Sequence, residues 1–373
     1  MDTRSRKSFW ERFAYKELSK IGPGTDDPLE RLSKQELGSI RQIRLRTLTK
    51  AALAGATGVI VLYTPYYLFG ESLFPIRQLH LPFTEKIIDI EYEYYGYSLI
   101  LVLIEIWYLN LLNIKSVAKI ARACGFPDEI NEDYENNLSA LIAVGLEKKH
   151  KQLQSIGINP YMGLSQWKLF AYQIAIRFKA LLTNILFKML ISRLLGRYVL
   201  RAVIDLVGIP VYAFWNAYAS SVIIREALVR IMAPPLIKKF VDQIYAVHNQ
   251  NDDIKQIVYD SLQSISVSKR SYHYNHFLLS ISLLNKFDIP VKENPYFIDD
   301  FHDYMRNADQ DVKNAYSKVL VFGIIIDGKV SKREIILLEK MKAENIVPYT
   351  IDEIRNWATD FDAGRGLDSF IYK

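Results

Sequence analysis

Two long apolar runs stand out in the first third of the chain. The first covers residues 51–70, between Lys50 and Glu71, and the second covers 94–114, where Glu105 is the only charge. Each run is long enough for a helix of about 30 Å, the thickness of the hydrocarbon core of a bilayer. Small residues at helical spacing in the first run, and tyrosines near its end, are typical of membrane-spanning helices. The pattern predicts a transmembrane helical hairpin, with buried helices of a soluble protein as the alternative.

Basic residues flank this predicted hairpin on one side. They are Arg41, Arg44, Arg46 and Lys50 before the first run, and Lys115, Lys119 and Arg122 after the second. The connection over 71–93 carries two basic residues against five acidic ones. Positive charge accumulates on the cytoplasmic side of membrane proteins. We therefore expect a protein integral to the cytoplasmic (inner) membrane, with both termini cytoplasmic and basic helices over residues 1–50.

Glu105 lies in the middle of the second run. A carboxylate at that depth costs about 2.5–3.5 kcal/mol unless it is paired or protonated, so it should face protein rather than lipid. We expect a structural hydrogen bond to the first run, for example to Thr57 or Tyr63. The alternative is that Glu105 lines the pathway of a channel or transporter.

Residues 115–240 form a basic and apolar segment, in which 148–204 contains no acidic residue. We expect helices lying against the anionic inner leaflet. The basic residues proposed to contact lipid are Lys168, Arg177, Lys179, Lys188, Arg193, Arg197 and Arg201. A charge-free stretch follows over 206–224, but a crossing there would leave the next basic residues outside unless another crossing compensated. We therefore place this stretch at the membrane face, and a second hairpin stays open.

The remainder of the chain, 241–373, has ordinary helical spacing and turn residues, which predict a soluble helical domain. Its formal net charge is −4, whereas residues 1–240 carry +10. No alternating strand pattern of useful length is visible in the chain. The sequence as a whole predicts an all-α fold with a transmembrane hairpin, a basic amphipathic helical module and a C-terminal helical domain.

Residues 201–227 carry a glycine, an asparagine and an alanine at a spacing that resembles the EcsC-like family. These residues are Gly208, Asn216 and Ala227, with apolar residues between them. The resemblance implies association with a membrane.

A second motif, Asp327-Gly328-Lys-Val330 followed by Glu334, resembles the turn of the TerB-like (tellurite-resistance) helical domain. The resemblance implies a cytoplasmic module near a membrane, and some such modules hold a metal at an acidic site. Isoleucines occupy 324–326, where metal binding would need further acidic residues. We therefore expect a structural helix–turn–helix in which Asp327 caps, Gly328 turns and Glu334 supports the next helix.

Candidate catalytic residues are sparse. No His-Glu-x-x-His, Gly-x-Ser-x-Gly or Cys-x-x-Cys motif and no dinucleotide fingerprint occurs. His273 and His276 are three residues apart, and with His302 they are the candidates for a lipid-handling enzyme at the inner membrane face. The lone cysteine, Cys124, excludes an internal disulfide and favours a reducing compartment. We expect no enzyme activity, cofactor, metal or nucleic-acid partner.

The function that agrees best with these features is a non-enzymatic membrane scaffold or envelope-stress sensing component. Its expected partners are anionic membrane lipids and a protein bound through the C-terminal domain. Assembly into a homo-oligomer stays open.

Overall fold

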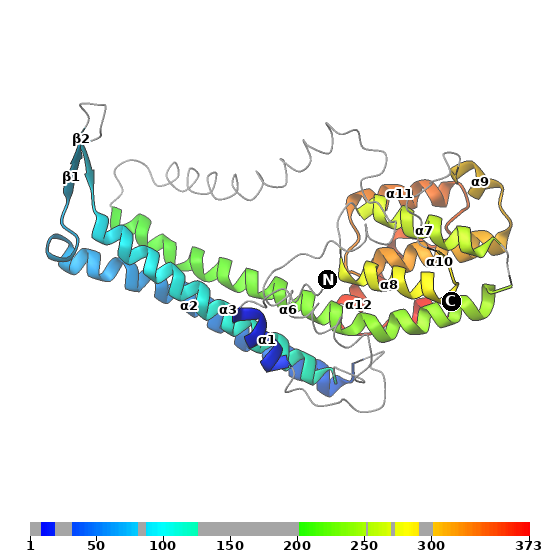
Figure 1. The fold of residues 1–373 in the computed structure, drawn as a ribbon, viewed down its shortest axis with the longest axis horizontal. Helices are drawn as coiled ribbons and strands as arrows, with labels where there is room; N and C mark the ends of the chain where they lie inside the picture. Colours follow the sequence, from blue (N-terminus) through cyan, green and yellow to red (C-terminus); the bar gives the residue numbers. More distant parts are fainter. Residues whose placement is uncertain are drawn as a thin grey trace, which may run out of the picture. The chain divides into compact units, whose positions relative to one another are not determined.

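Helices form nearly all of the regular structure in a computed structural model of the chain (Figure 1). The all-α fold class is therefore confirmed. The structure describes residues 9–18, 32–80, 87–125, 201–250, 253–269, 273–290 and 301–373. The described helices are α1 (Phe9–Leu18), α2 (Lys34–Leu73), α3 (Tyr92–Ala123), α6 (Arg201–His248), α7 (Ile254–Lys269), α8 (Tyr274–Lys286), α9 (Phe301–Asn307), α10 (Gln310–Ile325), α11 (Lys332–Ala343), α12 (Ile351–Asp362) and α13 (Asp368–Ile371).

The chain divides into two compact units. One, which we call the hairpin unit, comprises Gln42–Ser116 and Gln166–Ile224. The other, which we call the C-terminal unit, comprises Met1–Arg41, Val117–Ser165 and Arg225–Lys373. Helix α6 contributes to both, since the boundary falls between Ile224 and Arg225. The C-terminal unit thus takes in α6 from Arg225, whereas the sequence led us to expect a domain beginning at 241.

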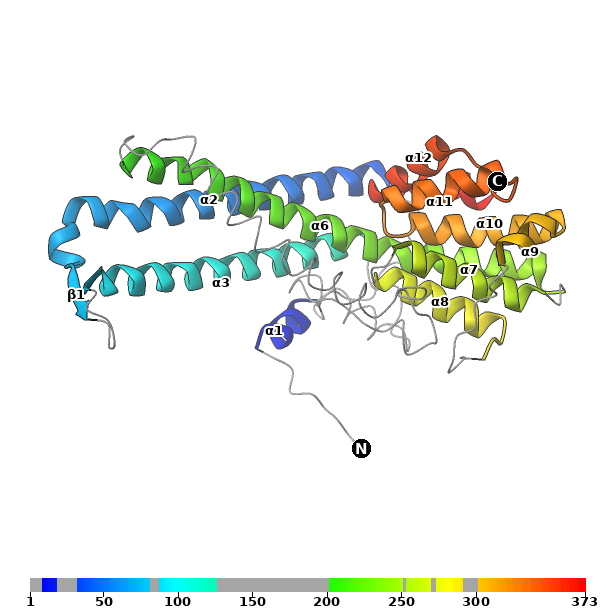
Figure 2. The same cartoon turned by 90° about the horizontal axis from the view of Figure 1, so that it is seen from above.

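In the hairpin unit, α2, α3 and the first part of α6 lie side by side, as both views show (Figures 1 and 2). Near one end the Thr47 and Ser116 hydroxyls of α2 and α3 are 2.8 Å apart. Towards the other end the rings of Tyr66, Phe74 and Tyr94 pack together, with centroids 4.8–6.2 Å apart. The polar contact and the aromatic cluster together fix α2 against α3 along their length.

Helix α2 contains a proline whose missing N–H is compensated from α3. Pro65 cannot donate to the carbonyl of Val61, four residues earlier, and a kink follows at Phe69. The hydroxyl of Tyr97 donates instead to that carbonyl, at 2.7 Å. In lipid no water can satisfy a freed carbonyl, and neighbouring side chains take this role in membrane helices. The contact is therefore suited to an apolar environment.

A short two-stranded antiparallel sheet joins α2 to α3. Strand β1 (Arg77–His80) pairs with β2 (Ile87–Ile90), with Arg77 opposite Ile90 and His80 opposite Ile87. These strands were not predicted from the sequence, because four residues are too few for an alternating pattern to be recognised.

The outer faces of α2 and α3 are apolar and exposed. Among the large apolar side chains left exposed are Leu53, Leu68, Leu99, Leu103, Ile104 and Trp107. In the described part of the chain, two helices over Lys34–Gly70 and Tyr92–Ala123 are long and apolar enough to cross a membrane. They contain the two runs, 51–70 and 94–114, from which the hairpin was predicted.

The C-terminal unit has α10 at its core. Residues 319–326 are all buried, and Gly323 lets α10 approach α7, because a Cβ there would lie 2.2 Å from Cδ1 of Ile265. The ring of Phe322 stacks on Phe240 of α6, with centroids 3.9 Å apart. Helices α7 and α6 pack on α10. This packing brings the end of α7 to the turn where α10 ends and α11 begins.

Candidate functional site

The motif Asp327-Gly328…Glu334 forms the turn between α10 and α11. Gly328 has φ of 71°, a conformation that favours glycine, and Asp327 Oδ1 accepts a hydrogen bond from the amide of Lys329 at 3.0 Å. The N-cap of α11 is Ser331 and not Asp327, so the expectation that Asp327 caps this helix was wrong. Glu334 closes the capping box by accepting from the Ser331 amide at 2.6 Å. The three residues singled out in the sequence thus lie in one tight helix–turn–helix.

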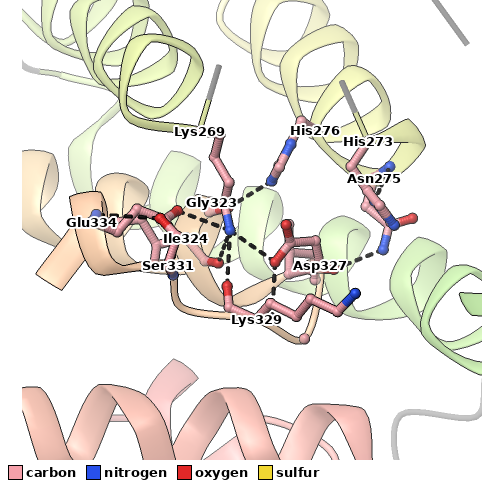
Figure 3. A network of polar contacts seen from close by, with 12 residues as sticks. Lys269, His273, Asn275, His276, Gly323, Ile324, Asp327, Lys329, Ser331 and Glu334 are labelled. Carbon is pink, nitrogen blue, oxygen red and sulfur yellow. Dashed lines mark hydrogen bonds and ion pairs between the residues drawn. The ribbon is translucent and has the colours of Figure 1, made fainter. Parts of the chain in front are cut away.

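Lys269, at the end of α7, occupies the centre of this turn (Figure 3). Its Nζ lies 2.8 Å from Asp327 Oδ1 and 2.8 Å from Glu334 Oε1. It also donates to the carbonyls of Ile324, at 2.8 Å, and Lys329, at 2.9 Å. An ammonium group has three N–H donors, so four oxygens more than satisfy it. A side-chain cation therefore fills the space that the oxygens of the turn enclose.

Burial makes this ion-pair cluster sensitive to the loss of any member. The Lys269 side chain is 4% exposed and that of Glu334 is 0% exposed. Burial by itself would raise the pKa of Asp327, but the Lys269 charge outweighs it and the pKa lies below its usual value. The turn is thus held by buried charges whose partners come from two different helices.

Two histidines adjoin the cluster, His273 as the N-cap of α8 and His276 in the first turn of that helix. Burial lowers the pKa of His276 to about 3, so the ring is neutral, and its Nε2 lies 3.0 Å from the carbonyl of Gly323. His273 Nδ1 accepts a hydrogen bond from the Asn275 amide at 3.1 Å, and His273 Nε2 lies 2.7 Å from Glu226 Oε1. Both nitrogens of His273 are therefore engaged.

Glu226 of α6 is ionised despite its position. Burial favours its neutral acid, but the hydrogen bond from His273 and the charge of Arg230 lower its pKa to about 2.

A general base must present a free atom to a substrate, and the contacts of His273, His276 and Glu226 are directed into the protein. Within the described residues, no group of three or more His, Cys, Asp or Glu side chains could hold a metal ion. The side chain of His302 lies outside them.

The hairpin unit contains a second polar site, between three helices. Glu105 Oε1 of α3 accepts a hydrogen bond from Asn216 Nδ2 of α6 at 2.5 Å. A Cβ added to Gly58 of α2 would lie 3.4 Å from Glu105 Oε2, and one added to Gly55 would lie 2.6 Å from the Tyr212 carbonyl oxygen. The two glycines therefore allow α2 to approach both members of the polar pair, as small residues do in membrane helix packing.

The partner of Glu105 differs from the one expected. The sequence analysis suggested Thr57 or Tyr63 of the first run, whereas the hydrogen bond goes to Asn216 of α6. The signals in the sequence were the small-residue spacing of Gly55 and Gly58 and an asparagine within the charge-free stretch 206–224. Neither signal shows by itself that the two segments meet.

The predicted lipid-contacting residues Lys168, Arg177, Lys179, Lys188, Arg193 and Arg197 lie outside the described residues. Arg201 is the first residue of α6, and its side chain is not described.

Comparisons with family models, curated proteins and solved structures found no match for the chain. They therefore bear on neither the EcsC-like nor the TerB-like resemblance, and both stay predictions.

Proposed function

We propose that the protein is an integral membrane scaffold, anchored by α2 and α3, whose C-terminal helical unit binds a protein partner on the cytoplasmic side. The observation that supports it most is the hairpin unit's distribution of polarity. Apolar side chains cover the outer faces of α2 and α3, while the polar pair Glu105–Asn216 and the Val61 carbonyl are satisfied between helices. This arrangement suits lipid, in which unsatisfied polar groups are costly.

Several further features agree with this proposal. Tyr66, Tyr67, Tyr94 and Tyr95 cluster where α2 and α3 meet the β1–β2 connection, as aromatic residues do at membrane interfaces. The basic flanks of the two runs support a cytoplasmic position for the opposite ends of α2 and α3. Anionic lipids are the proposed contact for the basic segment 148–204.

Fractionation of the full-length protein tests the anchoring. We expect release by detergent alone, and retention in the membrane through washes with high salt and alkaline carbonate. Release by salt would show that only charged contacts hold the protein to lipid, because surface electrostatics are screened by salt. Recovery in the soluble fraction would overturn the proposal.

A channel or transporter subunit is the second candidate, because Glu105 is an ionisable group within a predicted span. Substitution Glu105→Gln separates the two functions. An amide oxygen can still accept from Asn216, so the scaffold proposal expects unchanged thermal stability and membrane level. Substitution Asn216→Leu leaves Glu105 without this partner. It should lower the free energy of unfolding by about 0.6–1.7 kcal/mol, the contribution of a hydrogen bond between membrane helices.

Ion flux in liposomes decides between them. Flux carried by the wild type and abolished by Glu105→Gln, at an unchanged protein level, would replace the scaffold with a channel. Equal flux in the two proteins would leave Glu105 with its structural contact alone.

A further inference from the structure

The first part of α6 runs antiparallel to α2 within the hairpin unit. A Cβ added to Gly208 would lie 3.5 Å from Val59 Cγ1, and Tyr212 packs against Gly55. Further along, the guanidinium of Arg44 donates to the Ser221 hydroxyl at 3.2 Å. Residue numbers thus rise along α6 as they fall along α2, over most of the predicted span. Figures 1 and 2 show the start of α6 on the side of the unit that carries β1 and β2.

These contacts also give the depth of α6. Asn216 bonds Glu105, which lies at the middle of the run 94–114, so this part of α6 is level with the centre of α3. Ser221 is level with Arg44, a residue of the basic flank. Arg201 precedes Gly208 by about 10 Å of helix at 1.5 Å per residue. The start of α6 is therefore displaced from Val59 toward the β1–β2 end.

One face of this part of α6 is aromatic and exposed. Its large exposed side chains are Tyr212, Phe214, Trp215, Tyr218 and Val222, and the rings of Phe214 and Tyr218 stack. No charge occurs between 206 and 224. A contiguous apolar surface of this kind marks contact with lipid or with another protein. The exposed apolar residues of α2 and α3 lie at the same depth, which favours lipid.

We infer that residues 206–224 of α6 form a third membrane-spanning segment, with acyl chains against the face of Tyr212, Phe214, Trp215, Tyr218 and Val222. The inference rests on the proposed membrane anchoring. It replaces the expectation that this stretch lies on the inner membrane face. The chain enters this segment from the β1–β2 side, so Arg225 and the basic residues after it remain cytoplasmic.

Spin labels at three sites of matched exposure test the lipid contact. Phe214 is 60% exposed, Leu99 of α3 is 61% exposed, and Val247, in the last turn of the same α6, is 65% exposed. Each is replaced by cysteine in a Cys124→Ala background and labelled with a nitroxide. The full-length protein is then reconstituted in vesicles. Collision with oxygen, which concentrates in lipid, is compared with collision with a water-soluble nickel chelate.

We expect Phe214→Cys to match Leu99→Cys, with high oxygen and low nickel accessibility, and Val247→Cys to show the reverse. Nickel accessibility at 214 equal to that at 247 would overturn the inference while leaving the hairpin intact. Low accessibility to both reagents at 214 would also overturn it, because another protein surface would then cover this face. High nickel accessibility at residue 99 would instead refute the membrane anchoring itself.

The side on which α6 begins is tested on intact spheroplasts with a membrane-impermeant maleimide. Gln78→Cys in β1 and Asp352→Cys in α12 are the outer and inner references, since both side chains are exposed. A cysteine at Arg201, the first residue of α6, is tested in the same background. Labelling of residue 201 without permeabilisation, like residue 78, supports the crossing. Labelling only after permeabilisation, like residue 352, overturns it.

Discussion

Replacing Lys269 by methionine tests whether the buried cluster holds the C-terminal unit together. The substitution keeps the length of the side chain but leaves Asp327 and Glu334 facing each other without a cation, 2.8 Å from where Nζ was. Removal of one partner from a buried ion pair costs about 3–5 kcal/mol, because the remaining charge stays uncompensated. The carbonyls of Ile324 and Lys329 also lose a donor. We expect a loss of local stability in this range.

Hydrogen exchange of the full-length protein in detergent measures this loss. Amides of α7 and α10 should exchange roughly 100- to 4,000-fold faster in Lys269→Met, the factor that corresponds to about 3–5 kcal/mol. Lys329→Met is the matched control, since its side chain is exposed and its charge belongs to the same turn. The control should change exchange by less than about threefold, equivalent to under ~0.7 kcal/mol.

The loss of stability in Lys269→Met should depend on pH, and the titration of Asp327 determines whether this loss grows or shrinks as the pH falls. Its pKa lies below the usual 3.8 in the folded protein, so its ion pair stabilises the fold above that pH. This contribution is lost as the pH falls below 3.8 through the folded value. The difference between wild type and variant should therefore be largest near neutral pH and shrink under acid conditions. A change below 1 kcal/mol at neutral pH, or one that stays constant into acid, would refute the role assigned to Lys269.

Three other experiments probe the packing. Tyr97→Phe should lower thermal stability in detergent, by about 0.5–1.5 kcal/mol for the lost hydrogen bond, and adding Pro65→Ala, which restores the helical donor, should remove the difference. Gly55→Ala should cost about 1–3 kcal/mol through its clash with α6, whereas Gly96→Ala, with open space around it, should be neutral in the same melt. Burial raises the pKa of Cys124 to about 12, so its thiol should resist alkylation at neutral pH until denaturant is added; rapid modification of the native protein would contradict this.

Composition along the chain could predict the helices of the hairpin unit but not their ends. Two long apolar runs, with Glu105 as their only charge, predicted helices, and α2 and α3 contain both runs. The helices extend to Lys34 and Ala123 because flanking charged residues, solvated at the surface, remain good helix formers. Strands β1 and β2 were missed because their pairing, rather than any internal pattern, defines them.

The turn at Asp327, Gly328 and Glu334 could be found from the sequence because its determinants are local. The φ of 71° at Gly328 and the capping box depend on residues within one turn of chain. Lys269 could not be found in this way, since it precedes Asp327 by 58 residues. Asn216 is likewise 111 residues from Glu105. Tertiary packing determines such partners. The spacing of residues in a single sequence does not predict which distant residues come into contact.

Glu105 and Lys269 illustrate the same physical constraint in two surroundings. Each is an ionisable side chain between helices, Glu105 half-buried and Lys269 buried. Each has its partner on another helix, so a shift of either helix would leave a polar group unsatisfied. This constraint fixes the register of α3 against α6 and of α7 against the α10–α11 turn. It also explains why charge within an apolar segment is a weak guide to transport or catalysis, because a paired charge already has a structural role. The comparison of Glu105→Gln, which keeps an acceptor, with Asn216→Leu, which removes the donor, separates that role from ion conduction.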